Sequence, residues 1–238
     1  MRLNRRSKFN VLLVALIFSG CATFEPGFHY RDIMRDRQPT VTELREGLEN
    51  SVEEFITPKK SLQAFDADIA PYGVLALLLR VENKGPQHYR LQRKSIKAFL
   101  GEQPLVPLSG KEAANQAATS EYAGKALVST LAAGPFALLW FGLPTIASLT
   151  HTASVNAKIE QHFGTLELTD TFLKPNKTVA GLVYFKLPDN AKRLERLAVE
   201  VEPFEEKSEK QLSFRFSLPT FELSAPVSAP IGEVREEK

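Results

Sequence analysis

The sequence predicts a mainly β fold with inserted helices, and three observations support this prediction. Short runs of alternating apolar and polar residues recur along most of the chain. Polar turn residues separate these runs, without the strand–helix–strand rhythm of parallel sheets. One long apolar stretch interrupts the runs and has helical features at both ends. We therefore expect an Ig-like antiparallel β-sandwich that carries an apolar helical hairpin, with a further helix at its N-terminal side.

The sandwich is expected between residues 59 and 223. Residues 72–82 place apolar side chains on both faces of one strand, so this strand should be buried on both sides. Further runs with strand character are residues 89–100, 105–108, 179–187, 197–201 and 212–218. The prolines and terminal charges of residues 224–238 predict a disordered tail.

An amphipathic helix is expected over residues 40–58, before the first strand. Thr40 and Glu43 have the spacing of a capping box. Apolar residues then recur at helical spacing up to Pro58, namely Val41, Leu44, Leu48, Val52 and Phe55.

The interruption, residues 109–163, is expected to form the helical hairpin. Ser109 and Glu112 make a capping box for its first helix, and Pro144 is well placed to begin its second. Residues 126–157 contain no Asp, Glu, Lys or Arg, but the glycines and prolines among them break any continuous spanning helix. The predicted tip consists of Phe136, Leu138, Leu139, Trp140, Phe141 and Leu143.

Three arrangements of this tip fit the sequence. The tip can fold back and cover an open face of the sandwich, so that its side chains are part of the core. It can be exposed and contact the lipid surface or a groove in an envelope protein, for which Trp140 suits an interfacial depth. A transmembrane hairpin is the third arrangement.

The N-terminus has the organisation of an export signal. Residues 1–8 are basic, residues 9–18 are almost wholly apolar, and Phe18-Ser19-Gly20-Cys21 follows. This string resembles the lipobox of bacterial lipoproteins, although Phe18 stands where Leu is usual. The resemblance implies that a signal peptide, residues 1–20, is removed and that covalent lipid is attached to Cys21. Residues 21–39 then read as a lipidated tether, and no other cofactor is expected.

Charge and motif content exclude several classes of function. Four of the 30 basic residues lie in the expected signal peptide, so the remainder nearly balances 28 acidic residues and predicts no nucleic-acid partner. The four histidines, His29, His88, His151 and His162, lack metal-binding spacing, so no metal site is expected. There is no nucleophile elbow or phosphate loop, which predicts a protein that is not an enzyme.

Several strings resemble a group of uncharacterised bacterial lipoproteins, whose Ig-like domain is interrupted by an apolar segment with Gly and Pro. They are residues 64–68, 73–77, 81–85 and 175–185, and Asn176 stands where Gly is typical. The resemblance implies a fold and no activity.

The expected function is that of a non-catalytic, lipid-anchored envelope protein that acts as a binding or scaffolding module. Its partners would be the membrane, through the anchor, and an envelope protein or lipid at the tip. Ala22 lacks the charge of an inner-membrane retention signal, which favours the outer membrane, facing the periplasm. The alternative is a periplasmic carrier of lipid or another small apolar ligand.

Overall fold

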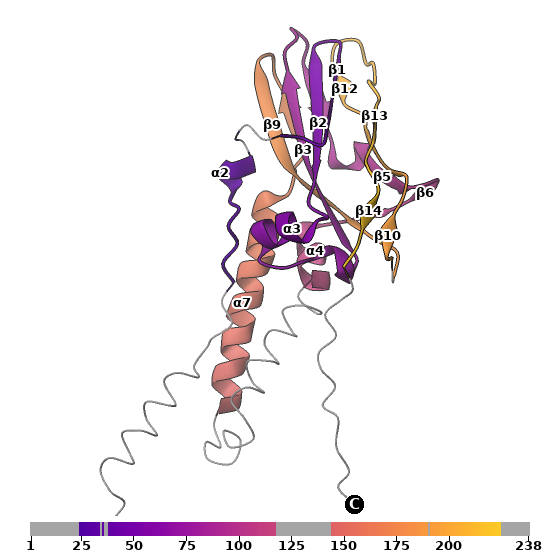
Figure 1. Cartoon of the computed structure of the whole chain (residues 1–238). Coiled ribbons are helices and arrows are strands. Elements are labelled where there is room, and N and C mark those ends of the chain that lie inside the picture. The colour runs from indigo at the N-terminus through magenta and orange to yellow at the C-terminus, as the bar shows by residue number, and fades with distance from the viewer. Residues whose placement is uncertain (1–23, 34, 36–37, 118–143, 190, 225–238) are drawn as a thin grey trace, which may run out of the picture.

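The computed structural model describes residues 24–33, 35, 38–117, 144–189 and 191–224, shown in colour in Figure 1. This part of the chain is mainly β, and its named strands pair only in antiparallel fashion. The largest sheet has five strands in the order β1 (Val41–Arg45), β2 (Leu48–Glu54), β3 (Val74–Asn83), β9 (Lys177–Lys186) and β7 (Val106–Leu108).

Three smaller sheets complete the β structure. The four-stranded sheet has the order β13 (Phe214–Ser217), β11 (Leu197–Val201), β5 (Ile96–Leu100) and β6 (Gln103–Pro104). The three-stranded sheet has the order β12 (Phe204–Glu205), β4 (Tyr89–Leu91) and β8 (Thr171–Leu173). The last sheet pairs β10 (Arg193–Leu194) with β14 (Phe221–Glu222).

One apolar core lies between these sheets, and we call it the sheet core. The five-stranded sheet contributes Leu77 from β3 and Phe185 from β9. The four-stranded sheet contributes Ile96 from β5 and Val199 from β11. Antiparallel sheets therefore share a single buried interior, as the alternation of apolar residues predicts.

A second apolar core, the helical core, lies on the other face of β3 and β9. Four α-helices of the described chain lie on this side: α2 (Tyr30–Ile33), α3 (Pro58–Phe65), α4 (Gly110–Ala117) and α7 (Pro144–Leu166). In Figure 1, α2 lies beside the sheets and α7 extends below them. Val74, Ala76 and Leu78 of β3 belong to the helical core, whereas Leu75, Leu77, Leu79 and Val81 belong to the sheet core. This confirms that β3 is buried on both faces, with Arg80 as its first half-exposed residue.

The prediction of a helix over residues 40–58 is wrong, because β1 and β2 form a hairpin there. Glu46 (φ 49°) and Gly47 (φ 79°) make its two-residue turn, and both adopt the positive φ that such hairpin turns require. Leu48 and Val52 are four residues apart, a spacing that fits one face of a strand as well as one face of a helix. Thr40 precedes a strand and caps no helix. Its backbone N–H donates to the Val52 carbonyl of β2 at 2.8 Å.

The structure has a helix at each end of the predicted hairpin, residues 109–163. The capping box at α4 is confirmed, because Glu112 Oε2 accepts from the Ser109 N–H at 2.7 Å and Ser109 Oγ accepts from the Glu112 N–H at 3.2 Å. Helix α7 begins at Pro144 as expected and continues to Leu166. Helix α7 packs closely against α4. A Cβ atom added at Gly110 of α4 would lie only 3.0 Å from the Gly164 Cα atom of α7.

The predicted tip of the hairpin lies outside the described residues. Its six apolar residues, from Phe136 to Leu143, fall in the segment between α4 and α7. Among the helices that the structure does describe, α7 included, we find none with both the length and the apolarity needed to span a bilayer.

The strings that resemble the lipoprotein group have structural roles. The Asn83 side chain organises the turn after β3: its Oδ1 accepts from the Gly85 N–H at 3.0 Å, and its Nδ2 donates to the Gln87 carbonyl at 2.7 Å. Asn176 adopts a left-handed φ of 59°, as expected of a residue standing in for Gly. At Gly181 an added Cβ would lie 2.6 Å from the Leu168 Cα atom, so β9 can approach this segment only through a glycine.

Candidate functional site

The chain that follows the predicted lipid-attachment site docks against the helical core. Cys21 itself lies outside the described residues, but Phe28 and Ile33 are each only 1% exposed. The Phe28 ring lies 5.4 Å from the Phe55 ring, and the Phe24 ring meets the His162 ring of α7 edge-on at 5.4 Å. The expectation of a tether over residues 21–39 is thus corrected for residues 24–33, because Phe24, Phe28 and Ile33 pack against the domain. Residues 21–23, 34 and 36–37 lie outside the described part of the chain.

An aromatic cluster beneath this segment explains where it docks. The Phe65 ring at the end of α3 lies 4.8 Å from the Phe163 ring of α7, and the Phe163 ring lies 5.5 Å from the Tyr184 ring of β9. The Tyr184 hydroxyl donates to the Phe163 carbonyl at 3.1 Å, and burial raises the pKa of Tyr184 well above its usual value. A sheet and two helices are therefore joined through rings that are all fully buried.

His162 lies at the contact between the docked segment and α7. Its Nε2 is 2.8 Å from the Ala64 carbonyl, which requires Nε2 to carry the proton in this hydrogen bond. Burial lowers the pKa of His162; the hydrogen bond to Ala64 opposes this effect, and the charge of His29 adds to it. The imidazole is therefore held neutral at this contact.

This environment predicts an acid-sensitive contribution to stability. The pKa of His162 is lower in the folded chain than in the unfolded chain, where it is about 6.5. The unfolded state therefore binds more protons, and the free energy of unfolding should decrease as pH falls below that value and through the folded pKa. Urea unfolding at pH 7.5 and pH 5.5 should show a larger loss for the wild type than for His162→Gln. His88→Gln, at an exposed turn, is the control and should lose as much as the wild type. An equal loss in the His162→Gln variant would refute the assignment.

A second feature is a cavity of about 500 Å³ that is partly open to solvent and is lined by side chains of both large sheets. Its floor is apolar and contains side chains of both large sheets, namely Ile96 of β5 and Phe185 of β9. The chain passing from β6 to β7 forms one wall with Pro104, Leu105 and Pro107. We call this cavity the inter-sheet pocket; its volume is in the range of ligand-binding pockets.

The rim of the inter-sheet pocket is mostly basic. Arg93, Lys94 and Lys97 line it together with a single carboxylate, Asp170. Asp170 accepts a hydrogen bond from the Arg93 backbone N–H at 2.8 Å. Lys97 pairs with Glu202 at 2.8 Å, and this hydrogen bond raises the pKa of Lys97. Acidic partners and Asp170 offset most of this positive charge, which leaves Lys94 as the cation able to meet a negative group at the mouth of the cavity.

The cations on this rim differ in what they contact. The guanidinium of Arg93 forms an ion pair with Glu167, and Lys97 pairs with Glu202. Lys94 is exposed, and none of the ion pairs or hydrogen bonds between described side chains involves its ammonium group. Lys94 is thus the rim cation whose charge has no acidic partner within the described chain.

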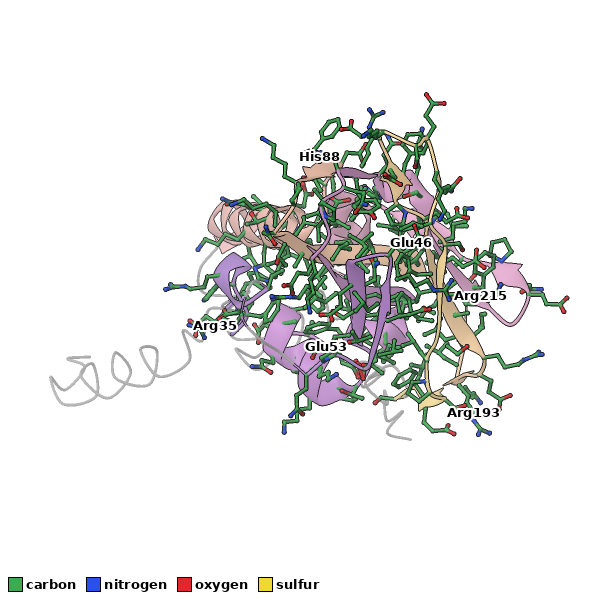
Figure 2. All side chains as sticks on the ribbon, turned by 90° about the horizontal axis from the view of Figure 1, so that it is seen from above. Arg35, Glu46, Glu53, His88, Arg193 and Arg215 are labelled. Carbon is green, nitrogen blue, oxygen red and sulfur yellow. The ribbon has the colours of Figure 1, made fainter. Side chains whose placement is uncertain are left out.

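The basic surface continues beyond the inter-sheet pocket. An adjoining hollow of about 380 Å³ shares Lys94 and Lys97 with it and is also lined by Arg90 and by Glu202. Arg90 forms an ion pair with Glu206 at 3.4 Å. The Arg90 guanidinium lies 5.0 Å from the centre of the exposed Phe172 ring, at the in-register position of β8. Another cation, Arg193, lies near the outer edge of the molecule in Figure 2.

Sequence reasoning missed the rim residues, although one feature could have indicated them. Arg90, Arg93, Lys94 and Lys97 all fall within eight residues, the densest basic run after the expected signal peptide. Burial raises the pKa of Asp68, and a hydrogen bond to Ser224 opposes this effect. In the ranges that the structure covers, no three His, Cys, Asp or Glu side chains gather as metal ligands would.

Comparisons with known proteins give little further information. No protein-family model matches the chain, and no curated protein matches it in sequence. Among solved structures, the chain is similar to a candidate lipoprotein, ycdA, of Bacillus subtilis subsp. subtilis strain 168, with 11% identity and a TM-score of 0.35. The match covers 76% of this chain and 39% of that protein, so the chain spans well under half of the length of the protein it matches.

Proposed function

We propose that this protein is a lipid-anchored, non-catalytic binding or scaffolding module of the bacterial envelope. The observation that carries the proposal is the docking of Phe24 and Phe28 against the helical core. Cys21 precedes Phe24 by three residues, and three residues span at most about 11 Å. Lipid on Cys21 would therefore hold the helical side of the domain close to the bilayer.

Lipid attachment also accounts for the unusual N-terminal sequence. Several acyl chains, at about 0.8 kcal/mol per buried methylene, make a durable anchor, whereas one chain is only marginal. With Ala22 after the cysteine, we assign the protein to the outer membrane, facing the periplasm. The domain itself we assign to the Ig-like class, which antiparallel sheets sharing one core support.

The contact with a partner would be the apolar tip, residues 136–143, and the helices that flank it support this choice. Helix α7 has 23 residues, which corresponds to about 34 Å at 1.5 Å per residue. Its C-terminal part packs in the helical core through Ile159 and Phe163, on the side where the chain from Cys21 docks. The tip and the anchor would then serve the same side of the domain.

The alternative function, a carrier of lipid or a small apolar ligand, is favoured by the inter-sheet pocket. Its floor is apolar and lies between sheets that can enclose a chain. A carrier needs this pocket, whereas a scaffold needs only its partner surface.

Photo-crosslinking from position 140 in intact cells tests the proposed function. A photoreactive residue in place of Trp140 should crosslink to an envelope protein if the module scaffolds a partner through its tip. Crosslinks to lipid alone would favour a contact of the tip with the membrane over a contact with a partner protein. Crosslinks confined to the chain itself would show that the tip is part of the core, which would contradict its role as a contact.

A further inference from the structure

We propose that the inter-sheet pocket binds a single-chain anionic amphiphile, with the acyl tail between the sheets and a carboxylate head group at Lys94. The proposal does not depend on the lipid anchor or on the tip. It rests on the position of the cavity, on the chemistry of its floor and on the charge of its mouth.

The position of the pocket suits an elongated apolar tail. Ile96 and Phe185, which belong to facing sheets, are 4% and 2% exposed, so the cavity reaches the side chains of the sheet core. Leu105 lies between β6 and β7, where the chain crosses from one sheet to the other. A tail that enters here would extend the existing apolar interior, and each buried methylene would contribute about 0.8 kcal/mol.

The wall of the pocket offers few backbone N–H groups to a ligand. Pro104 and Pro107 have no backbone N–H, and both lie on short strands at sheet edges. An additional strand would find few partners at such edges. The wall therefore suits an apolar ligand better than an extended peptide that pairs with the backbone.

The charge at the mouth selects the head group. Three cations and one carboxylate line the pocket, and Arg93 and Lys97 already contact acidic side chains. The ammonium group of Lys94 can therefore bind a ligand carboxylate without breaking an ion pair of the described chain. A neutral head group would gain nothing from this charge.

A photoactivatable dodecanoate tests the proposal on the full chain in nanodiscs of neutral phosphatidylcholine, with empty nanodiscs as the blank. We expect crosslinks within residues 93–107 and at residues 170–185, and we expect excess dodecanoate to prevent them. Dodecanol, which has the same tail without the charge, should compete about tenfold less well, because the carboxylate contact is absent.

Charge reversal at the mouth separates head-group recognition from simple partition into an apolar cavity. Lys94→Glu should weaken dodecanoate labelling about tenfold and leave competition by dodecanol unchanged. Lys59→Glu, on the exposed side of α3, is the matched control and should label as the wild type does. Thermal unfolding of each variant confirms that it is folded.

Three results would overturn the proposal. They are the absence of specific labelling, labelling that dodecanol prevents as well as dodecanoate does, and labelling confined to residues 136–143. The third result would place the amphiphile at the apolar tip. Acylation of Cys21 is measured separately, so failure of this proposal would leave the proposal of a lipid anchor unaffected.

Discussion

Cys21→Ser should abolish acyl incorporation and should move the chain out of the membrane fraction. The cysteine thiol is the group to which the lipid would be attached, and a serine hydroxyl does not replace it in this chemistry. Without acyl chains the mature domain loses its anchor, since each buried methylene contributes about 0.8 kcal/mol to membrane binding. Metabolic labelling with a radioactive fatty acid, followed by fractionation of the cells, measures both effects.

The matched control for this experiment is Thr23→Ser, two residues after the cysteine. This variant should incorporate the label and stay with the membrane as the wild type does. Label that persisted in the Cys21→Ser variant would show that the lipid is attached elsewhere. The assignment of Phe18-Ser19-Gly20-Cys21 as a lipobox would then be wrong.

Phe65→Ala should have the largest effect on stability within the described chain. The Phe65 ring is fully buried and lies 4.8 Å from the Phe163 ring and 6.4 Å from the Tyr184 ring. Removing a large buried ring typically lowers the free energy of unfolding by about 3–5 kcal/mol. The loss should also loosen Phe24, because α3 and α7 together form its docking surface.

Urea unfolding measures this effect, and proteolysis measures the loosening of the N-terminal segment. Leu62→Ala on the same helix is the control: Leu62 is 46% exposed, and its loss should change the free energy by only about 0.5 kcal/mol. Phe65→Leu keeps part of the apolar volume and should give an intermediate loss if the alanine variant does not fold. Equal stability of the Phe65→Ala and Leu62→Ala variants would contradict the role given to the helical core.

The elements predicted correctly from the sequence are those whose local residue pattern fits only one kind of secondary structure. In β3, apolar residues fill both alternating faces, which no amphipathic surface element would do, and the structure buries both faces. The start of α4 was predictable because a capping box is a local hydrogen-bond pattern between Ser109 and Glu112. The hairpin of β1 and β2 was not, because its spacing also fits a helix and its turn, Glu46-Gly47, is a weak sequence feature.

The candidate sites differ in the same way. The proposed lipobox is a local string, so the residues themselves indicate it. The inter-sheet pocket joins Lys94 to Asp170 and Phe185, which only the pairing of distant strands brings together. Docking of Phe24 and Phe28 was missed because Pro26 and Gly27 disrupt the local pattern, whereas the deciding contacts are with α7 and Phe55.

The intact mass and N-terminal sequence of the chain purified from bacterial membranes test the central claim most directly. We expect a polypeptide that begins at residue 21 and carries the added mass of acyl groups on that residue. A chain that still begins at Met1, or one cleaved at this point with a free thiol, would contradict the account of a lipid-anchored envelope module.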